Sequence, residues 1–514
     1  MKTKPHWWFW VCLTLSSAPA IAASPTLGIF DGQSDIGSVV PAGTASYDPS
    51  TDSYTLTAAG ANAWYRVDAF HFVWKKLNGD MSLTADVDFP PATDGHEPNP
   101  HRKAMLMLRQ SLDDGGVYVD AAQHGVGLTA LQYRLEQGAN TQDIEVGISD
   151  PKTIRIVKRG DEFTLYAAAA GEALHQVGAS IKLHLDGSFY VGLGLTSHDP
   201  ATMDKVVFSH VKLEAPAPLP DKLVPFSSIQ TVEINDQYRR AVVALTKQGV
   251  VEAPDWSVDG KALLFNADGH FYSVPVSDPP EIVAPLPFDT GEASGCWGEH
   301  GYSPDGKWFA ISCSTPSHHG PDVYIVPASG GAARQVTNHP ISFFRGWSPD
   351  GKTIVFTSIR DGHTDLYTIP AAGGAETRLT NVGLNDGAEY TPDGKYIYFN
   401  SDRTGLMHIW RMKPDSSEPE QITSDDRNNW YPHISPDGKS IVFLSYDKAV
   451  KGHAPNQDVA LRLFTPEDGQ IRTLVTLFGG QGSLDSNTWA PDSKHLAFVA
   501  YQMLPATDAR PENR

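Results

Sequence analysis

The sequence Ser348-Pro349-Asp350-Gly351-Lys352 and five close copies of it decide the fold of this chain. Successive aspartates of the six copies are separated by 46, 45, 43, 44 and 55 residues. In such a turn proline presets the first φ angle, aspartate bonds the backbone ahead, and glycine takes the positive φ. A period in the forties whose turns join two apolar runs predicts the blades of a β-propeller. The other copies are Ser257-Val258-Asp259-Gly260-Lys261, Ser303-Pro304-Asp305-Gly306-Lys307, Thr391-Pro392-Asp393-Gly394-Lys395, Ser435-Pro436-Asp437-Gly438-Lys439 and Ala490-Pro491-Asp492-Ser493-Lys494.

The runs around these turns predict how the ring closes. Each blade is expected to contain four strands, but only one strand, 494–501, and a polar tail, 506–514, follow the last turn. Two apolar runs before the first turn, 229–234 and 240–246, have no other place. We expect them to complete the last blade, because this leaves no exposed sheet edge. The prediction is a six-bladed propeller with two-plus-two strand closure over residues 227–505.

This region resembles the TolB-type six-bladed propeller family. The resemblance implies the propeller fold. It does not imply a role in the Tol–Pal complex, because the Tol–Pal component carries an α/β domain ahead of its propeller and this chain is expected to carry a sandwich there. Besides the turns, the motifs that carry the resemblance are Ile369-Pro370-Ala371-Ala372-Gly373-Gly374, Arg378-Leu379-Thr380 and Ser401-Asp402-Arg403-Thr404-Gly405.

Residues 24–214 lack the repeat and carry many short alternating runs instead. In the run 81–89, the apolar Leu83, Ala85 and Val87 share one face, as a half-buried antiparallel strand requires. Many such strands in succession predict a β-sandwich, so the whole chain is expected to be all-β. A Pro-rich stretch at 215–221 predicts a stiff linker, 215–226, between sandwich and propeller.

The sandwich resembles the concanavalin-like (laminin-G-like) jelly-roll superfamily. That superfamily includes lectin-like modules and some glycosidases, so the resemblance implies the fold and no single activity. The residues that carry it are Phe70-His71-Phe72-Val73-Trp74-Lys75-Lys76, Arg102-Lys103-Ala104-Met105-Leu106-Met107-Leu108-Arg109-Gln110 and Tyr118-Val119-Asp120-Ala121-Ala122-Gln123-His124-Gly125.

The first 23 residues have the pattern of an export signal. Lys2 and Lys4 precede a short apolar stretch, and Ala20-Ile21-Ala22 fits a small-residue cleavage site. No run reaches the roughly 20 apolar residues of a transmembrane helix. We therefore expect an exported protein, periplasmic or secreted, without a membrane span in the mature chain. The net charge of −20 argues against nucleic acid as a partner.

Two cysteines follow the leader, Cys296 and Cys313, on either side of the second turn. An antiparallel hairpin would bring them together, and an oxidising compartment favours a disulfide. Two buried, unpaired thiols are the alternative.

Polar side chains that differ from blade to blade predict a ligand site in the central channel. Most lie at the first end of an inner strand, and His453 lies on a loop between the second and third strands of the fifth blade; we expect both places at a channel mouth on the face opposite the turns. A mixed polar set at such a mouth is typical of a ligand site, whereas polar groups that bond neighbouring strands and water are the alternative. The candidate ligand-binding residues are Glu252, His300, Arg345, Asp386, Glu389, His433, His453 and Asn487, and Asp255, Glu299, Asn429 and Asp485 belong to the same set.

The chemistry of this mouth stays open. His300, His433 and His453 could bind a divalent metal together with Glu389, although no local ligand spacing supports this. Arg345 could pair with a substrate carboxylate. No motif requires a cofactor, and no Gly-x-Ser-x-Gly nucleophile elbow occurs.

Three functions are therefore weighed. The first is a binding module whose lectin-like sandwich and channel mouth hold a glycan or an envelope protein. The second is a polysaccharide lyase or glycosidase that uses Glu252, Glu389 or His433 as acid or base. The third is a scaffold in an envelope complex. We expect the binding module, because no motif is specific for a reaction, and the sequence leaves the oligomeric state open.

Overall fold

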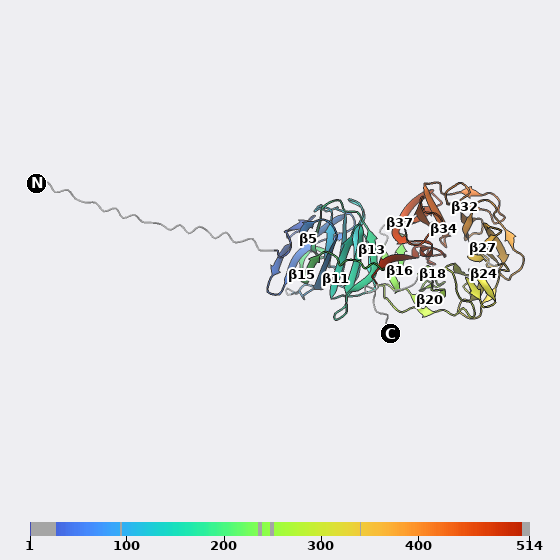
Figure 1. Ribbon diagram of the computed structural model, residues 1–514. Helices are drawn as coiled ribbons and strands as arrows, with labels where there is room; N and C mark the ends of the chain where they lie inside the picture. Colours follow the sequence, from blue (N-terminus) through green and yellow to red (C-terminus); the bar gives the residue numbers. More distant parts are fainter. Residues whose placement is uncertain (2–26, 93–94, 235–238, 247–250, 340, 506–514) are drawn as a thin grey trace.

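The computed structural model describes residues 1, 27–92, 95–234, 239–246, 251–339 and 341–505 (Figure 1). This part of the chain contains strands and one 3-10 helix, η1 (Gln481–Ser483), so the all-β prediction is confirmed. None of its helices is long and apolar enough to cross a membrane. Apart from Met1, the predicted leader 1–23 lies outside the described residues, as does the predicted tail 506–514.

The N-terminal unit consists of two packed sheets. One sheet contains, in spatial order, β1 (Gly32–Ile36), β5 (Val67–Leu77), β14 (Phe189–Thr196), β7 (Lys103–Arg109), β8 (Tyr118–His124), β9 (Thr129–Arg134) and β10 (Gln142–Val146), with β4 (Asn62–Trp64) beside β5. The other contains β13 (His175–Lys182), β12 (Glu162–Ala168), β11 (Thr153–Arg159), β6 (Met81–Asp88), β15 (Asp199–Glu214), β3 (Ser53–Gly60) and β2 (Thr44–Asp48).

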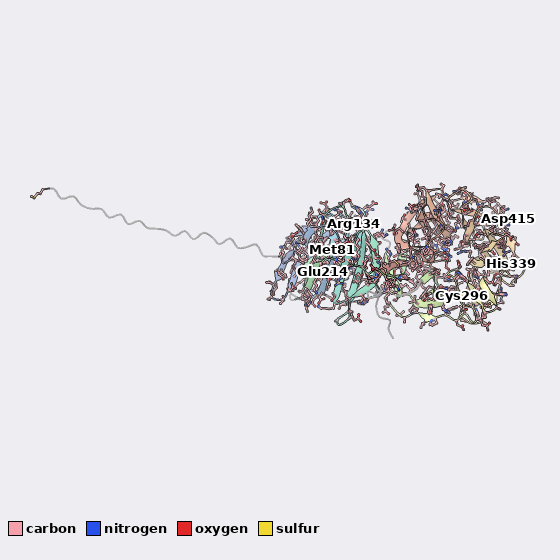
Figure 2. The ribbon with its side chains drawn as sticks, viewed as in Figure 1. Met81, Arg134, Glu214, Cys296, His339 and Asp415 are labelled. Carbon is pink, nitrogen blue, oxygen red and sulfur yellow. A yellow bond between two sulfur atoms is a disulfide. The ribbon has the colours of Figure 1, made fainter. Side chains whose placement is uncertain are left out.

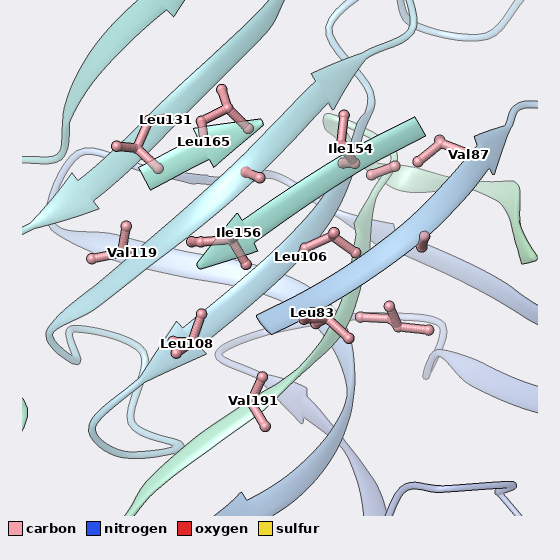
Figure 3. Close-up of a cluster of buried hydrophobic side chains, with 14 of the residues drawn as sticks. Leu83, Val87, Leu106, Leu108, Val119, Leu131, Ile154, Ile156, Leu165 and Val191 are labelled. Carbon is pink, nitrogen blue, oxygen red and sulfur yellow. The ribbon is translucent and has the colours of Figure 1, made fainter. Parts of the chain in front are cut away.

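Alternate residues of these strands meet in one apolar core (Figure 3). Leu83 and Ile156 come from the β13–β2 sheet, and Leu106 and Val119 come from the facing sheet, all without exposed surface. The period of two decides which side chains enter this core, but Ser82 and Thr84 beside Leu83 are buried as well, so β6 is not the half-buried strand that the alternation predicted. The two packed sheets are present, whereas their assignment to the concanavalin-like superfamily stays a prediction.

Five separate sheets of four strands each form the blades. The first two are β18 (Val251–Trp256), β19 (Ala262–Ala267), β20 (His270–Pro275), β21 (Leu286–Pro287), and β22 (His300–Tyr302), β23 (Trp308–Thr315), β24 (His318–Pro327), β25 (Arg334–Gln335). The next two are β26 (Ser342–Trp347), β27 (Thr353–Arg360), β28 (His363–Pro370), β29 (Thr377–Arg378), and β30 (Asn385–Tyr390), β31 (Ile397–Ser401), β32 (His408–Met412), β33 (Glu420–Gln421). The fifth is β34 (Arg427–Ile434), β35 (Ile441–Asp447), β36 (Gln457–Thr465), β37 (Gln470–Gly479).

The repeated turn joins the first two strands of each blade. In the third blade the Ser348 hydroxyl donates to Asp350 at 2.7 Å, and Asp350 accepts the Lys352 amide at 3.1 Å. Gly351 has a φ of 69°, which a residue with a Cβ rarely adopts. The turn chemistry expected from the sequence is therefore present.

The prediction of six blades is wrong, because five separate blades are present. The strands meant for a sixth, β38 (His495–Leu504), β16 (Val224–Glu233) and β17 (Arg240–Thr246), lie at one end of an 11-stranded sheet. β16 pairs with β38, and β17 pairs in parallel with β10, so this sheet continues into the N-terminal unit. β16 also begins inside the expected linker 215–226.

The end of this shared sheet completes the ring (Figure 1). β38 packs between β18 of the first blade and β37 of the fifth. Val499 of β38 shares an apolar cluster with Phe265 of the first blade, and Phe498 shares one with Leu444 of the fifth. The polar channel therefore has a continuous wall.

Side-chain contacts also join the two units. The Gln176 amide donates to Gln502 Oε1 at 2.6 Å, and the Gln230 amide donates to the Gly178 carbonyl at 3.2 Å. Gly178 has a φ of 87°, and a Cβ there would lie 2.6 Å from Leu245 Cδ2. A glycine is thus required where the N-terminal unit approaches β17.

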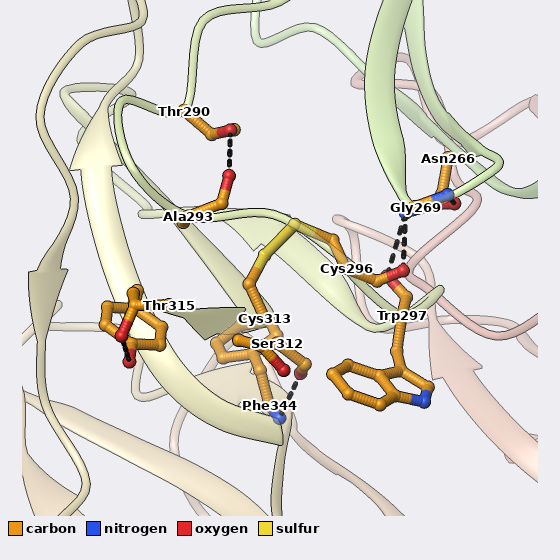
Figure 4. The surroundings of a disulfide bond; sticks show 12 residues. Asn266, Gly269, Thr290, Ala293, Cys296, Trp297, Ser312, Cys313, Thr315 and Phe344 are labelled. Atoms are coloured by element: carbon orange, nitrogen blue, oxygen red, sulfur yellow. Dashed lines mark hydrogen bonds between the residues drawn. A yellow bond between two sulfur atoms is a disulfide. The ribbon is translucent and has the colours of Figure 1, made fainter. Parts of the chain in front are cut away.

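Cys296 and Cys313 form a disulfide in the second blade (Figure 4). Cys313 lies on β23, and Cys296 lies on the segment that leads into β22, where its amide donates to the Gly269 carbonyl at 3.0 Å. Figure 2 places Cys296 on the propeller, on the part of the ring formed by the first blades. Of the two states that the sequence left open, the structure contains the bonded one.

Candidate functional site

Bulges in the inner strands turn polar side chains toward the channel. In β18, β30 and β34 the pairing with the next strand shifts register just before Asp255, Glu389 and His433. A bulge re-aims the side chains that follow it, which explains why these positions leave the plain alternation of the strand. The residue two positions earlier has a positive φ in all three strands: Ala253 (54°), Gly387 (60°) and Tyr431 (53°).

Arg345 is the centre of the first polar network. Its side chain is 5% exposed, and its guanidinium lies 2.8 Å from Asp386, 2.9 Å from Asp485 and 3.5 Å from Glu299. It also lies over the Tyr431 ring, 5.2 Å from the centroid. Because three carboxylates of the protein already surround the guanidinium, the expected pairing with a substrate carboxylate would require one of them to be displaced.

Glu389 and His433 form a second network. Glu389 Oε2 lies 2.7 Å from His433 Nδ1, and its Oε1 accepts the Asn487 amide at 2.8 Å. His433 Nε2 lies 3.1 Å from the Leu484 carbonyl. A carbonyl only accepts, so Nε2 carries a hydrogen and a further proton lies between Glu389 and Nδ1. Both groups are therefore held by the protein itself.

Residues 480–487, which we call the plug, cross the channel at the end away from the turns. Ser483 and Leu484 have no exposed surface. The end that was expected to be an open mouth is therefore covered by the chain. The plug contacts all five blades. In the first blade, Gly482 lies so close to Glu252 that a Cβ on Gly482 would be 2.6 Å from the Glu252 Cγ, and in the second, Ser486 donates to the Gly298 carbonyl at 2.9 Å. In the third, fourth and fifth blades the plug binds through side chains at Asp485 and Asn487 and through the Leu484 carbonyl, and the partners are Arg345, Glu389 and His433 respectively.

The channel contains more carboxyl groups than its cations can neutralise. Burial, and then the Asp485 carboxylate, raises the pKa of Glu252 to about 7. Burial and Glu389 hold the pKa of Asp255 well above its usual range, and burial and Asp485 do the same for Glu299. Buried carboxyl groups without a cation keep their protons, so part of this set is neutral near pH 7.

Replacing Glu252 with glutamine should flatten part of the pH dependence of stability. The pKa of about 7 in the folded chain lies above the unfolded value of about 4.3, so the stabilising proton is lost as pH rises through 7. Glu252→Gln should therefore exceed the wild type at pH 8 by roughly 3 kcal/mol, with no such gain at pH 4. Thermal midpoints from pH 4 to 8 measure this. Glu467→Gln, on the exposed turn between β36 and β37, is the control, and matching curves for Glu252→Gln and wild type would refute the assignment.

A cavity of about 500 Å³, which we call the funnel, opens at the turn end of the channel. Tyr302, Phe344 and Tyr390 form part of its wall. Its rim consists of turn residues, namely Val258, Pro304, Pro349, Pro392, Pro436 and Pro491. Its polar floor consists of Asp255, His300, Arg345, Glu389 and Asn487. The open side of the channel is thus the face opposite to the one predicted.

The indole rings beside the funnel pack between blades. Trp347 Nε1 donates to the Gly301 carbonyl at 3.1 Å, and Trp489 Nε1 donates to the His433 carbonyl at 3.0 Å, each in the preceding blade. These two indoles are 9% and 4% exposed. They hold neighbouring blades in register and offer little ring surface to a ligand.

The structure brings together five of the eight candidate residues, namely Arg345, Asp386, Glu389, His433 and Asn487. Glu252 lies against the plug, and His300 lies in the funnel floor. His453 lies on the loop between β35 and β36, with its ring 4.8 Å from Trp430 and 5.8 Å from Tyr431. The three histidines proposed for a metal therefore do not meet, and across the described residues no cluster of three or more His, Cys, Asp or Glu side chains is arranged for one.

Two parts of the site were not predicted from the sequence. The plug supplies a backbone carbonyl at Leu484, which no side-chain pattern reveals. Val258 joins the prolines at the rim although it breaks the Pro-Asp-Gly motif. The signal for the plug was the last step between turns, 55 residues against 43 to 46 elsewhere.

Comparisons with known proteins match the propeller. A family model described as the TolB beta propeller domain matches residues 302–501. An uncharacterised protein of Agrobacterium fabrum is 42% identical over 276 residues, which are 54% of this chain and 92% of that protein. The solved structure of a candidate TolB from Agrobacterium tumefaciens has 42% identity and a TM-score of 0.51, covering 54% of this chain and 99% of that one. TolB from Acinetobacter baumannii has 17% identity and a TM-score of 0.38, covering 63% and 79%.

Proposed function

Because the chain belongs to the TolB-like β-propeller family, we propose that it is a binding protein that holds a segment of a partner protein in the funnel. The observation that carries this proposal is the funnel itself, an open cavity of about 500 Å³ with a rim of turn residues and a polar floor. Cavities of this size with an apolar wall and few polar groups are typical of binding sites. The other end of the channel is filled by the plug, so a ligand would enter past the turns.

A peptide fits the funnel better than a glycan. The two tryptophans of the funnel, Trp347 and Trp489, are buried between blades, which leaves the partly exposed rings of Tyr302 and Tyr390 as the aromatic faces of the wall. The rim instead offers proline rings and Val258, which is 52% exposed, to apolar side chains. The internal pairing of Arg345, Glu389 and His433 gives no support to the lyase or glycosidase alternative. Glycan recognition by the concanavalin-like sandwich stays a prediction.

We infer that binding takes place outside the cytoplasm. The leader-like residues 1–23 support export, and the disulfide between Cys296 and Cys313 suits an oxidising compartment. A bacterial periplasm agrees with both observations. A part in a larger envelope complex would follow from such a partner.

Photo-crosslinking from the rim tests the proposal. A photoreactive amino acid at Val258, in the full chain produced in its native host, should give one discrete protein adduct after irradiation of intact cells. Val382 is the matched control, because it is a valine of similar exposure, 57% against 52%, outside the funnel. An adduct from position 258 and none from 382 supports the proposal. Equal labelling from both positions, or no adduct from 258, contradicts it.

A further inference from the structure

The floor of the funnel combines carboxyl groups with a histidine. Asp255 and Glu389 reach it from the first and fourth blades, and His300 reaches it from the second. We propose that the funnel takes a cationic side chain of the partner, the ammonium of lysine or the guanidinium of arginine, an inference that rests on the proposed partner-binding function. The charged nitrogen group of this side chain would lie at the floor, and its methylene groups would lie along the wall.

The charges of the channel favour a cation. Arg345 is the buried cation of this region, and Asp386, Asp485 and Glu299 already surround it. Even with His433 protonated, the carboxyl groups outnumber the cations six to two. An anionic ligand would add to this excess, whereas a cationic ligand would reduce it. The six carboxyl groups are those of Glu252, Asp255, Glu299, Asp386, Glu389 and Asp485.

Asp255 is the carboxyl group best placed to bind a cationic side chain at the funnel floor. It is 6% exposed, and the amides of Trp256 and Tyr302 donate to it. Burial, and then Glu389, favours its protonated form by raising its pKa. A cation at the floor would offset both causes and would give the ionised carboxylate a partner. Glu389 differs, because His433 and Asn487 already occupy its two oxygens.

His300 is an independent sign that the floor lacks a partner. Its ring is 2% exposed, yet neither ring nitrogen makes a hydrogen bond of good geometry to any group in the described part of the chain. Phe271 and Phe309 pack against it at 4.9 and 5.2 Å. Burial lowers the pKa of His300 to about 3 against the opposite influence of the nearby Gly298 and Leu264 backbone, so the ring is neutral and one of its nitrogens can accept a hydrogen bond. An N–H of an ammonium or guanidinium group would satisfy it.

The wall suits the stem of such a side chain. Tyr302 and Tyr390 present partly exposed aromatic rings beside the buried Phe344, and the rim adds proline rings. Lysine and arginine bury their methylene groups along apolar surface while the charged end finds a polar partner. A cation near a tyrosine face gains further attraction.

Small probes of one length test this inference on the full chain. They are n-butylammonium, n-propylguanidinium, 1-butanol and butyrate, with affinities measured by ligand-observed NMR titration. The two cations should bind at least about tenfold more tightly than butyrate, with 1-butanol between them. Asp255→Asn should remove most of this preference, and His300→Phe, which keeps a flat ring between Phe271 and Phe309, should weaken cation binding several-fold. Asp468→Asn, on the exposed turn between β36 and β37 and outside the funnel, should change neither value.

The outcomes separate this inference from the proposed function. Three outcomes overturn the cationic ligand. Butyrate binds as tightly as the cations, neither Asp255→Asn nor His300→Phe weakens cation binding, or no probe binds. In each of those cases the adduct from Val258 would still support partner binding. If that adduct is absent while the cations bind in the funnel, the partner-protein proposal fails and the cation site stands. Circular dichroism of each variant shows whether it is folded.

Discussion

Replacing Arg345 with leucine is expected to destabilise the propeller by about 3–5 kcal/mol. The substitution leaves Asp386, Asp485 and Glu299 buried beside one another without their cation, and removing one partner of a buried ion pair has a cost of this size. Urea unfolding followed by tryptophan fluorescence at pH 8 measures the loss. A shift in midpoint no larger than that of a surface variant would refute the role assigned to Arg345.

The pH dependence of this loss identifies its cause. Burial already raises the pKa values of Glu299 and Asp485, and without the guanidinium they rise further above their unfolded values, so protonation of these two groups stabilises the variant at low pH. The deficit of Arg345→Leu should therefore be smaller at pH 5 than at pH 8. Arg334→Leu is the matched control, because this exposed arginine donates to the Ala371 carbonyl and should cost less than about 0.5 kcal/mol. Adding Asp386→Asn to Arg345→Leu should recover part of the loss.

Removing the disulfide is expected to cost about 3 kcal/mol. Cys296 and Cys313 are 17 residues apart, and closing a loop of that length lowers the entropy of the unfolded chain by an amount of this order. The variant with both Cys296→Ala and Cys313→Ala keeps apolar side chains in the cluster around the bond. Its urea midpoint should fall below that of the oxidised wild type.

Reduction of the wild type provides the control for that experiment. Dithiothreitol should lower the wild-type midpoint to near that of the double alanine variant and should leave the variant unchanged. A wild-type midpoint that does not respond to reductant, with two alkylatable thiols in the native protein, would show that the bond is absent in solution.

Local patterns predicted the strands well. The run 81–89 matches β6, Met81–Asp88, to within one residue, and the run 240–246 coincides with β17. These elements follow from side-chain alternation and from turn residues within a few positions, so their signals lie in the segment itself. The pairing of β16 with β38 could also be predicted, because the repeat left the last strand without a neighbouring strand.

Partners far apart in the sequence were harder to predict. No residue of β10 signals that it pairs in parallel with β17, so the count of six separate blades failed there. The plug was missed for a similar reason, because its role depends on contacts with five blades and on the backbone of Leu484. The polar residues of the candidate site could be predicted from their positions in the repeat. Which face of the channel is open could not, because it depends on how the plug folds over the ring.

The parallel pairing of β17 with β10 has a consequence for the margin of the propeller. In a free-standing ring β17 would present a row of unpaired amides and carbonyls, and such a margin attracts strands of other molecules. Here the neighbouring half supplies the missing strand within the same polypeptide. The N-terminal half therefore covers this margin of the propeller, and we expect that severing the two halves would expose the margin to pairing with other molecules.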